Sequence, residues 1–216
     1  MDESSPDSTT ESQPTVFQNE KKHSNLKNSL STIGILLLAP LIAIVLTLYV
    51  FQSYQVDGPS METTLLHNDR LIVWKLARTW SRITGNQYVP NRGDIIILNE
   101  SGLSAYNGGD DTKQLVKRVI ALPGERIVIK DNIVTVYNRE NPNGFQPDTT
   151  LPYGKETAIP PTSDNLDVTL SETELFVCGD NRPQSLDSRR FGPIQTDQVV
   201  GKLVARILPL GEIKRF

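Results

Sequence analysis

The hydrophobic positions of this 216-residue chain form one long apolar run near the N-terminus and several short runs after it. The long run extends from Leu30 to Phe51 and contains no charged residue. At about 1.5 Å per residue, a helix of this length covers a hydrocarbon core of about 30 Å, and Pro40 is tolerable within it. A cleaved signal peptide has a shorter apolar region, and a core helix is rarely apolar on every side. We therefore predict a retained transmembrane signal anchor at residues 30–51.

The short runs after this segment predict β-strands, because they are apolar or alternate with period two and are bounded by turn residues. The expected strands are Arg70–Trp74, Ile95–Leu98, Gln114–Ala121, Leu175–Cys178 and Val199–Leu208, with a hairpin of 126–130 and 133–137 around Asp131-Asn132. Residues 77–92, 99–112 and 138–170 are dense in Gly, Pro and Asn and read as loops or irregular structure. We expect a mainly β fold, with antiparallel sheets forming a distorted barrel or sandwich, preceded by one N-terminal transmembrane helix.

The charges around the apolar run indicate how the chain is oriented. Lysines at positions 21, 22 and 27 precede the run, and acidic residues at 57, 62 and 69 follow it before Arg70. The positive-inside rule then places residues 1–29 in the cytoplasm, as a polar tail too poor in apolar residues to fold. Residues 52–216 form an extracytoplasmic domain, long enough for one core. We expect a single-pass protein of the plasma membrane or another energy-converting membrane.

Composition excludes several classes of function. The single cysteine, Cys178, excludes an intramolecular disulfide and lies in an apolar run, so we expect a buried, inert thiol. Two histidines and one cysteine cannot complete a tetrahedral zinc site without carboxylates, so we predict no metal and no cofactor. The net charge of -3 and the lack of a long Lys/Arg run argue against nucleic-acid binding. We expect a monomer.

Ser60 is the first candidate for chemistry. It follows Gly58-Pro59, where glycine is free to take positive φ and proline holds its own φ, so the turn can lift the hydroxyl clear of the backbone. The same tripeptide also occurs in ordinary turns. Ser60 lies nine residues after Phe51, a reach of at most about 30 Å, so it is tethered close to the outer face of the predicted membrane.

Lys117 is the second candidate. In the strand Gln114–Ala121 the alternation of side chains places Lys117 between Leu115 and Val119 on one face, and Arg118 on the other. Burial on an apolar face lowers the pKa of an ammonium group, and a neutral amine can then take the proton of a serine hydroxyl. The alternative is an edge-strand lysine that discourages aggregation. The two candidates together suggest a serine–lysine dyad.

A Ser-His-Asp triad is the competing chemistry, since triad members can come from any part of a chain. His67 and Asp69 follow Ser60 closely, in a polar turn. His23 falls on the cytoplasmic side of the predicted membrane. We interpret His67 as an exposed turn residue, so the dyad is the favoured reading.

Four motifs follow one another behind the apolar run: G-P-S-M-E-T-T-L, R-G-D-I-I-I, K-R-V-I-A-L-P-G-E and G-D-N-R-P-Q-S-L-D-S-R-R-F-G-P-I. In these motifs the chain resembles type I signal peptidases (leader peptidases), which are membrane-anchored serine peptidases. The resemblance covers about residues 30–210. It implies that the partners are the lipid bilayer and the signal peptides of secretory preproteins. It also implies cleavage after a small residue, typically alanine at the first and third positions before the cut.

The resemblance also implies roles for individual residues. Ser60 is the nucleophile, and its backbone N–H contributes to the oxyanion hole. Lys117 is the general base, and Ser185 hydrogen-bonds the lysine and orients it. Six further residues match positions that brace the site: Arg118, Asp180, Asn181, Arg182, Asp187 and Arg189.

Two positions depart from the family's pattern. Thr63 stands where a proline is common, which removes no reactive group. Gly58 stands where some members place a serine hydroxyl in the oxyanion hole, although other members also carry glycine here. The loss of one such donor costs about 10²–10³ in rate, so a second donor from elsewhere in the cleft is expected.

Two other functions fit parts of the same pattern. One is an anchored β-domain that binds signal-like segments without cleaving them, against which the retained Ser60, Lys117 and Ser185 count. The other is a self-cleaving Ser–Lys protease of the repressor type, against which the anchor and the absence of a DNA-binding half count. In the favoured reading, the signal peptide binds in an extended form along an edge strand.

Overall fold

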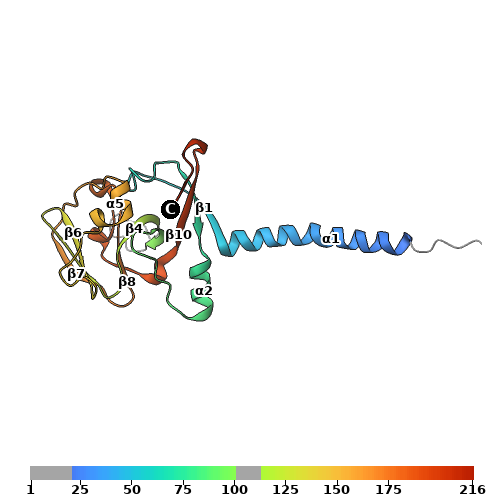
Figure 1. Ribbon diagram of the computed structural model, residues 1–216, viewed down its shortest axis with the longest axis horizontal. Helices are drawn as coiled ribbons and strands as arrows, with labels where there is room; N and C mark the ends of the chain where they lie inside the picture. The colour runs from blue at the N-terminus through green and yellow to red at the C-terminus, as the bar shows by residue number, and fades with distance from the viewer. Residues whose placement is uncertain (1–20, 101–112) are drawn as a thin grey trace, which may run out of the picture. The chain divides into compact units, whose positions relative to one another are not determined.

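The computed structural model describes residues 21–100 and 113–216 (Figure 1). The chain divides into two compact units, Met1–Ile44 and Val45–Phe216. The predicted loop at residues 101–112 and the first 20 residues of the predicted tail lie outside the described residues.

The N-terminal helix differs in its bounds from the predicted span. Helix α1 (Lys21–Val45) begins within the predicted tail, and a π-helical turn, η1 (Leu46–Val50), follows it. Phe51 is already the first residue of a strand, so it does not belong to the helix. Among the described residues, no helix combines the length and the apolar character that a membrane crossing requires. The predicted span is therefore not confirmed.

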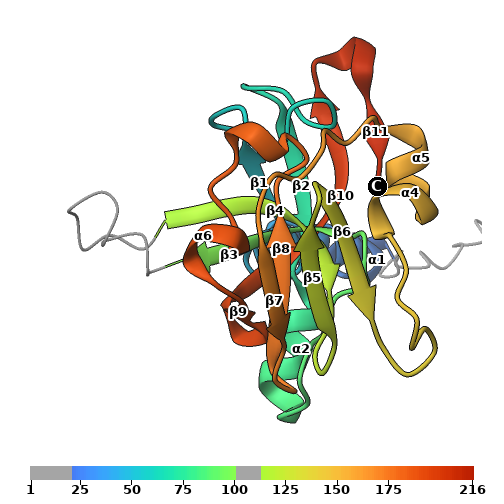
Figure 2. The same ribbon diagram turned by 90° about the vertical axis from the view of Figure 1, so that its left-hand side faces the viewer.

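The second unit is built on two antiparallel sheets. The larger sheet has the order β1-β2-β10-β3-β4-β8-β9, with β11 paired to β10, and the smaller one has the order β6-β5-β7. Figure 2 looks onto the three-stranded sheet. The strands of the larger sheet are β1 (Phe51–Gln55), β2 (Arg70–Trp74), β3 (Ile95–Glu100), β4 (Lys113–Ala121), β8 (Glu174–Cys178), β9 (Ile194–Gln195), β10 (Val199–Leu208) and β11 (Lys214–Arg215). Those of the smaller sheet are β5 (Arg126–Lys130), β6 (Ile133–Tyr137) and β7 (Leu166–Thr169).

This topology confirms the mainly β, antiparallel prediction and corrects the predicted barrel. Within the described residues the larger sheet is open, because β1 and β9 end the sheet on opposite sides without pairing to each other. The predicted hairpin is confirmed. Asp131 and Asn132 have φ values of 53° and 66°, as a two-residue turn between twisted strands requires.

The prediction of a single helix was wrong. Helix α2 (Leu76–Thr84) occupies the first half of the segment expected to be a loop, and Gly85, at φ 73°, ends it in the left-handed conformation. The remaining helical segments are short: α4 (Pro147–Thr150), α5 (Pro152–Glu156), α6 (Ser188–Phe191), η2 (Arg182–Gln184), η3 (Thr196–Gln198) and η4 (Leu210–Glu212). None of these segments carries the long apolar periodicity by which a helix is recognised in a sequence.

Strand β4 lies between the main hydrophobic clusters. Val119 packs with the buried cluster that includes Ile96 and Leu175, while its neighbour Ile120 packs in the cluster that includes Phe176 and Cys178. Cys178 is fully buried, and burial raises the pKa of its thiol, as expected for an inert cysteine. Because β4 is buried on both faces at its C-terminal half, its side chains are held rigidly where the strand approaches Ser60.

The segment after β1 is fixed by its own apolar residues. Val56, Met61 and Leu65 are buried in a cluster with Leu71 and Leu203. Ser60 lies between two of these buried residues, so its backbone cannot move without disturbing the core.

Candidate active site

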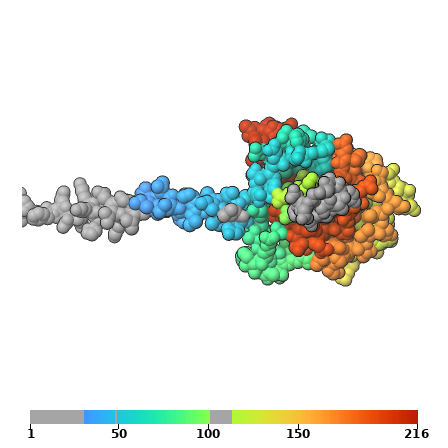
Figure 3. Space-filling view, turned by 180° about the vertical axis from the view of Figure 1, so that it is seen from behind, coloured from blue at the N-terminus to red at the C-terminus, as the bar shows by residue number. Residues whose placement is uncertain are grey.

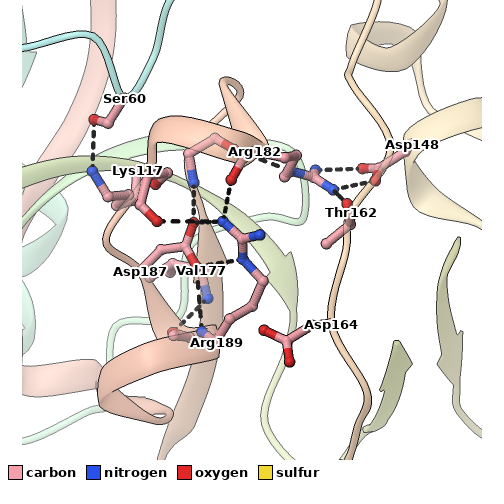
Figure 4. A network of polar contacts seen from close by, with 12 residues as sticks. Ser60, Lys117, Asp148, Thr162, Asp164, Val177, Arg182, Asp187 and Arg189 are labelled. Atoms are coloured by element: carbon pink, nitrogen blue, oxygen red, sulfur yellow. Dashed lines mark hydrogen bonds and ion pairs between the residues drawn. The ribbon is translucent and has the colours of Figure 1, made fainter. Parts of the chain in front are cut away.

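Ser60 and Lys117 come together from segments that are far apart in the sequence. The turn of Ser60 is closed by the N–H of Glu62, which donates to Pro59 O at 3.0 Å. Lys117 extends from the middle of β4 and is 2% exposed. Its Nζ donates to Ser60 Oγ at 2.8 Å and to Val116 O at 2.9 Å (Figure 4). The nucleophile and base positions of a dyad are thus within hydrogen-bonding distance.

The surroundings of Lys117 favour the neutral amine. Burial lowers its pKa to about 8, although the negative charge of Asp187 opposes this shift. A lysine in water has its pKa near 10.4 and is almost fully charged at neutral pH. With the lowered value, a substantial fraction of Lys117 is neutral at mildly basic pH and can accept a proton from Ser60 Oγ.

The histidine of the competing triad points elsewhere. His67 is a mainly exposed side chain, and its Nδ1 accepts a hydrogen bond from the N–H of Gly58 at 3.3 Å. Asp69 is buried and accepts from the N–H of Leu66 and from Arg206. Neither side chain hydrogen-bonds Ser60 in the described structure, so the exposed-turn reading of His67 agrees with these contacts.

Asn181 holds the turn that contains Ser60 in place through three hydrogen bonds. Its backbone N–H donates to Ser60 O at 3.1 Å, and its Nδ2 donates to Pro59 O at 3.1 Å and to Glu62 Oε2 at 3.2 Å. The backbone of Gly179, two residues earlier, passes close to the same turn. A Cβ at Gly179 would lie 2.3 Å from Ser60 O. The backbone of the loop after β8 is therefore packed directly against the backbone of the Ser60 turn.

Arg118 points away from Lys117, as the alternation along β4 predicts. Its Nε donates to Asp180 Oδ1 at 2.8 Å and its Nη2 to Asp180 Oδ2 at 2.5 Å, in a fully buried pair. Thr64 Oγ1 donates to the same carboxylate at 2.5 Å. The guanidinium also stacks on the ring of Tyr153, 4.3 Å from its centroid. Asp180 thus links β4 to the segment that carries Ser60.

Asp187 and Arg189 form a second ion pair in the same loop. Arg189 Nε donates to Asp187 Oδ1 at 2.8 Å, and Asp187 Oδ2 accepts from the N–H of Gly179 at 3.0 Å. Asp187 also caps the start of α6 by accepting from the N–H of Arg189. The pair fixes Gly179 beneath the Ser60 turn and brings the charge of Asp187 near Lys117.

The structure adds a partner for Arg182 that sequence reasoning missed. This fully buried arginine pairs with Asp148 and donates to Thr162 Oγ1 at 2.5 Å and to Gly179 O at 3.0 Å (Figure 4). Asp148 belongs to α4, within the long segment predicted as irregular. That segment contains five acidic residues, and no signal in the sequence separates Asp148 from the others.

Ser185 lies next to these groups, but its predicted bond to Lys117 is not formed in this structure. Its Oγ is buried and makes no hydrogen bond within the described residues. A Cβ at Gly179 would lie 2.3 Å from this oxygen. Ser185 therefore lies in the loop after β8, close to Gly179. Its role in orienting Lys117 stays a prediction.

A small cleft opens beside the dyad. Its volume is about 100 Å³, and Tyr54, Ile97 and Val116 are among the residues that line it with Ser60 and Lys117. Strand β4 pairs with β3 from Lys113 to Arg118 but with β8 only from Arg118 onward. Within the described residues, no strand pairs with residues 114–117 of β4 on the side opposite β3, next to Ser60.

Comparison with known proteins identifies the family of this chain. The family described as "Signal peptidase, peptidase S26" matches residues 29–208. A signal peptidase I of Bacillus caldolyticus is 35% identical over 76% of this chain and 83% of its own length. A signal peptidase I of Bacillus licheniformis is 29% identical over 91% of this chain and 98% of its own length.

Among solved structures, a signal peptidase I from Enterococcus faecalis V583 is 28% identical. The match covers 53% of this chain and 97% of the solved chain, with a TM-score of 0.39. The family match extends over most of the chain and includes every residue of the site described above. The chain belongs to the signal peptidase family, peptidase family S26, and is a peptidase of signal peptides.

Proposed function

We propose that this protein is a membrane-anchored serine endopeptidase in which Ser60 is the nucleophile and Lys117 the general base. The observation that carries the proposal is the 2.8 Å hydrogen bond from Lys117 Nζ to Ser60 Oγ at a buried position. Membership of the signal peptidase family supports exported preproteins as its substrates.

The reaction proceeds in two steps. Neutral Lys117 takes the proton of Ser60 Oγ as this oxygen attacks the carbonyl carbon of the scissile bond. The backbone N–H of Ser60 stabilises the resulting oxyanion, and Lys117 returns the proton to the leaving amine. In the second step Lys117 takes a proton from water, which attacks the acyl-enzyme, and Ser60 leaves with its proton restored.

The substrate is held by strand addition. An extended signal peptide lies along the N-terminal part of β4, on the side where β8 pairs only from Arg118 onward. The small volume of the cleft suits small side chains before the cut. Ion pairs Arg118–Asp180, Asp187–Arg189 and Arg182–Asp148 hold the two loops of the site in register.

The membrane anchor is the segment of residues 30–51. Apolar side chains of α1 are open to solvent in the isolated chain, with Leu36 at 72% and Leu37 at 67% exposure. A lipid environment removes this apolar surface from water. The catalytic unit then lies outside the cytoplasm, where preproteins emerge, and one copy of the chain is sufficient for the site.

The test uses purified full-length protein in detergent and a peptide with an Ala-x-Ala cleavage site. We expect the wild type to cut after the second alanine, and Ser60→Ala and Lys117→Met to lose at least about 10³ in kcat/KM while remaining folded. The matched control is Lys130→Met, because Lys130 is an exposed lysine at the end of β5.

Each alternative has its own outcome. Activity that survives Lys117→Met but not His67→Ala would restore the triad. If the wild type cuts neither the peptide nor a full-length membrane preprotein, the result would indicate a domain that binds signal peptides without cleaving them. Self-cleavage of the purified protein, in place of one intact band, would favour the repressor-type reading.

A further inference from the structure

Helix α2 presents an apolar stripe to solvent. Leu76, Trp80 and Ile83 follow the i, i+4, i+7 spacing of one helix face. They are 38%, 63% and 72% exposed, and Trp74, just before the helix, is 39% exposed. A surface helix of a globular domain normally turns such a stripe toward the core, so this stripe is oriented for contact with something outside the domain.

The stripe adjoins the end of the N-terminal helical stretch. The N–H of Lys75 donates to Val50 O at 2.8 Å, and Thr79 Oγ1 donates to Tyr49 O at 3.2 Å, so α2 is bonded to η1. Tyr49 is itself 54% exposed. Figure 3 shows α2, in green, projecting from the body of the domain. We call the exposed side chains of this region the α2 face; they are Tyr49, Trp74, Leu76, Trp80 and Ile83.

The charges of this segment have one sign. Helix α2 carries Arg78 and Arg82 and no acidic residue, and Lys75 is its N-cap residue. A short basic helix with Trp and aliphatic residues along one side is typical of helices that lie in the interface of an anionic bilayer. Trp and Tyr are enriched at this depth because their rings have an apolar body and a polar group.

We propose that α2 lies in the plane of the membrane interface and forms a second contact of the catalytic unit with the bilayer. This inference rests on the proposed membrane location of the protein. Trp80 and Ile83 enter the boundary between headgroups and acyl chains, while the basic residues meet anionic headgroups. With η1 and α2 both at the interface, the unit cannot rotate freely about its anchor. The cleft at Ser60 is thereby held at a constant height for membrane-bound substrates.

The chain contains its own probe for this contact. Its two tryptophans, Trp74 and Trp80, both belong to the α2 face. In the variant Trp74→Phe, all tryptophan emission comes from Trp80. We would reconstitute this full-length variant in vesicles of phosphatidylcholine and phosphatidylglycerol. The expected result is blue-shifted emission, strong quenching by lipids brominated near the headgroup, and weak quenching by aqueous iodide.

A second measurement links the contact to function. The double variant Leu76→Ser/Ile83→Ser should cleave a soluble peptide as the wild type does, yet cleave a preprotein embedded in vesicles several-fold more slowly. The matched control is Ile133→Ser, which removes an exposed isoleucine (44%) from β6, outside the α2 face. This control should leave both activities unchanged.

The outcomes separate this inference from the proposed function. The bilayer contact would be overturned if the emission of Trp80 showed no blue shift and were quenched by iodide but not by brominated lipid. This holds whether or not peptide is cleaved. Protection of Trp80 in native membranes but not in pure lipid vesicles would assign the α2 face to a protein partner, and also overturns it. Loss of peptide cleavage in the wild type contradicts the proposed function alone.

Discussion

Gly179 passes so close to Ser60 that the position accepts no side chain: a Cβ would lie 2.3 Å from Ser60 O and 2.3 Å from Ser185 Oγ. The contact involves backbone on the Ser60 side, which cannot rotate away as a flexible side chain can. The loop after β8 and the turn of Ser60 are thus packed at the closest distance that two backbones allow. Glycine at this position is a condition for placing Ser60 against Lys117.

Gly179→Ala should therefore lower kcat/KM for peptide cleavage by at least about 100-fold, because displacing a reacting group by on the order of 1 Å has an effect of this size. Overpacking should also lower stability, by about 1–3 kcal/mol. The measurements are kcat/KM and the midpoint of urea unfolding. Gly211→Ala is the matched control, since a Cβ there meets no atom within 4 Å. Equal activity of the two variants would contradict the close packing.

The pH dependence of cleavage should follow Lys117. Burial lowers its pKa to about 8, and only the neutral amine is a base. The rate constant kcat/KM should therefore rise with pH and level off above about 8. A profile recorded from pH 6 to 10 checks this. An inflection near pH 6.5 that disappears in His67→Ala would instead indicate histidine as the base.

Lys117 should also lower the stability of the fold at neutral pH. Its pKa is lower in the folded state than the ordinary value of 10.5, so the unfolded chain binds the additional proton. This loss of unfolding free energy has its full size below about pH 8 and disappears as the pH rises to 10.5. Since each pKa unit corresponds to about 1.4 kcal/mol, Lys117→Met should stabilise the protein at pH 7 by on the order of 2–4 kcal/mol.

Urea unfolding at pH 7 and pH 10.5 measures this difference. The advantage of Lys117→Met over the wild type should shrink at the higher pH. Lys130→Met should show no such dependence, since Lys130 is exposed. An advantage that is equal at both values would mean that Lys117 is not held as a neutral amine by the fold.

The buried pair Arg118–Asp180 should be far more sensitive to substitution than an exposed pair of the same geometry. Asp180→Asn leaves the guanidinium of Arg118 uncompensated in the interior, at a cost of about 3–5 kcal/mol. It also weakens the bond from Thr64 and thus the position of the Ser60 segment. Unfolding free energy and kcat/KM should both fall.

Asp167→Asn is the control for this prediction. Arg126 and Asp167 form two hydrogen bonds of 2.8 and 2.5 Å, but their side chains are 47% and 55% exposed. Water screens such a pair, and its loss should change stability little. Similar losses for Asp180→Asn and Asp167→Asn would show that burial is not what makes the site's ion pairs important.

The sequence by itself predicted seven of the strands in the described residues (β2, β3, β4, β5, β6, β8 and β10) and the two candidate residues Ser60 and Lys117. Period-two alternation predicted β4 and placed Lys117 and Arg118 on opposite faces, and the structure agrees. Local chemistry also decided the hairpin at Asp131-Asn132. These features depend on near neighbours along the chain, which is why residue pattern alone reveals them. Residue types and motif order suggested Ser60 and Lys117 as a pair, but the local pattern does not place together two residues 57 positions apart.

Other features were decided only by tertiary structure. Helix α2 was missed because it has only nine residues with one short apolar stripe, and loop-forming residues from Gly85 onward follow it. The open edge of the larger sheet, in place of a barrel, depends on which strands meet across the whole unit. Asp148 could not be selected as the partner of Arg182 from sequence, because a buried ion pair is defined by desolvation and distance. Both quantities arise only once the chain has packed, and desolvation is also what lowers the pKa of Lys117 to about 8.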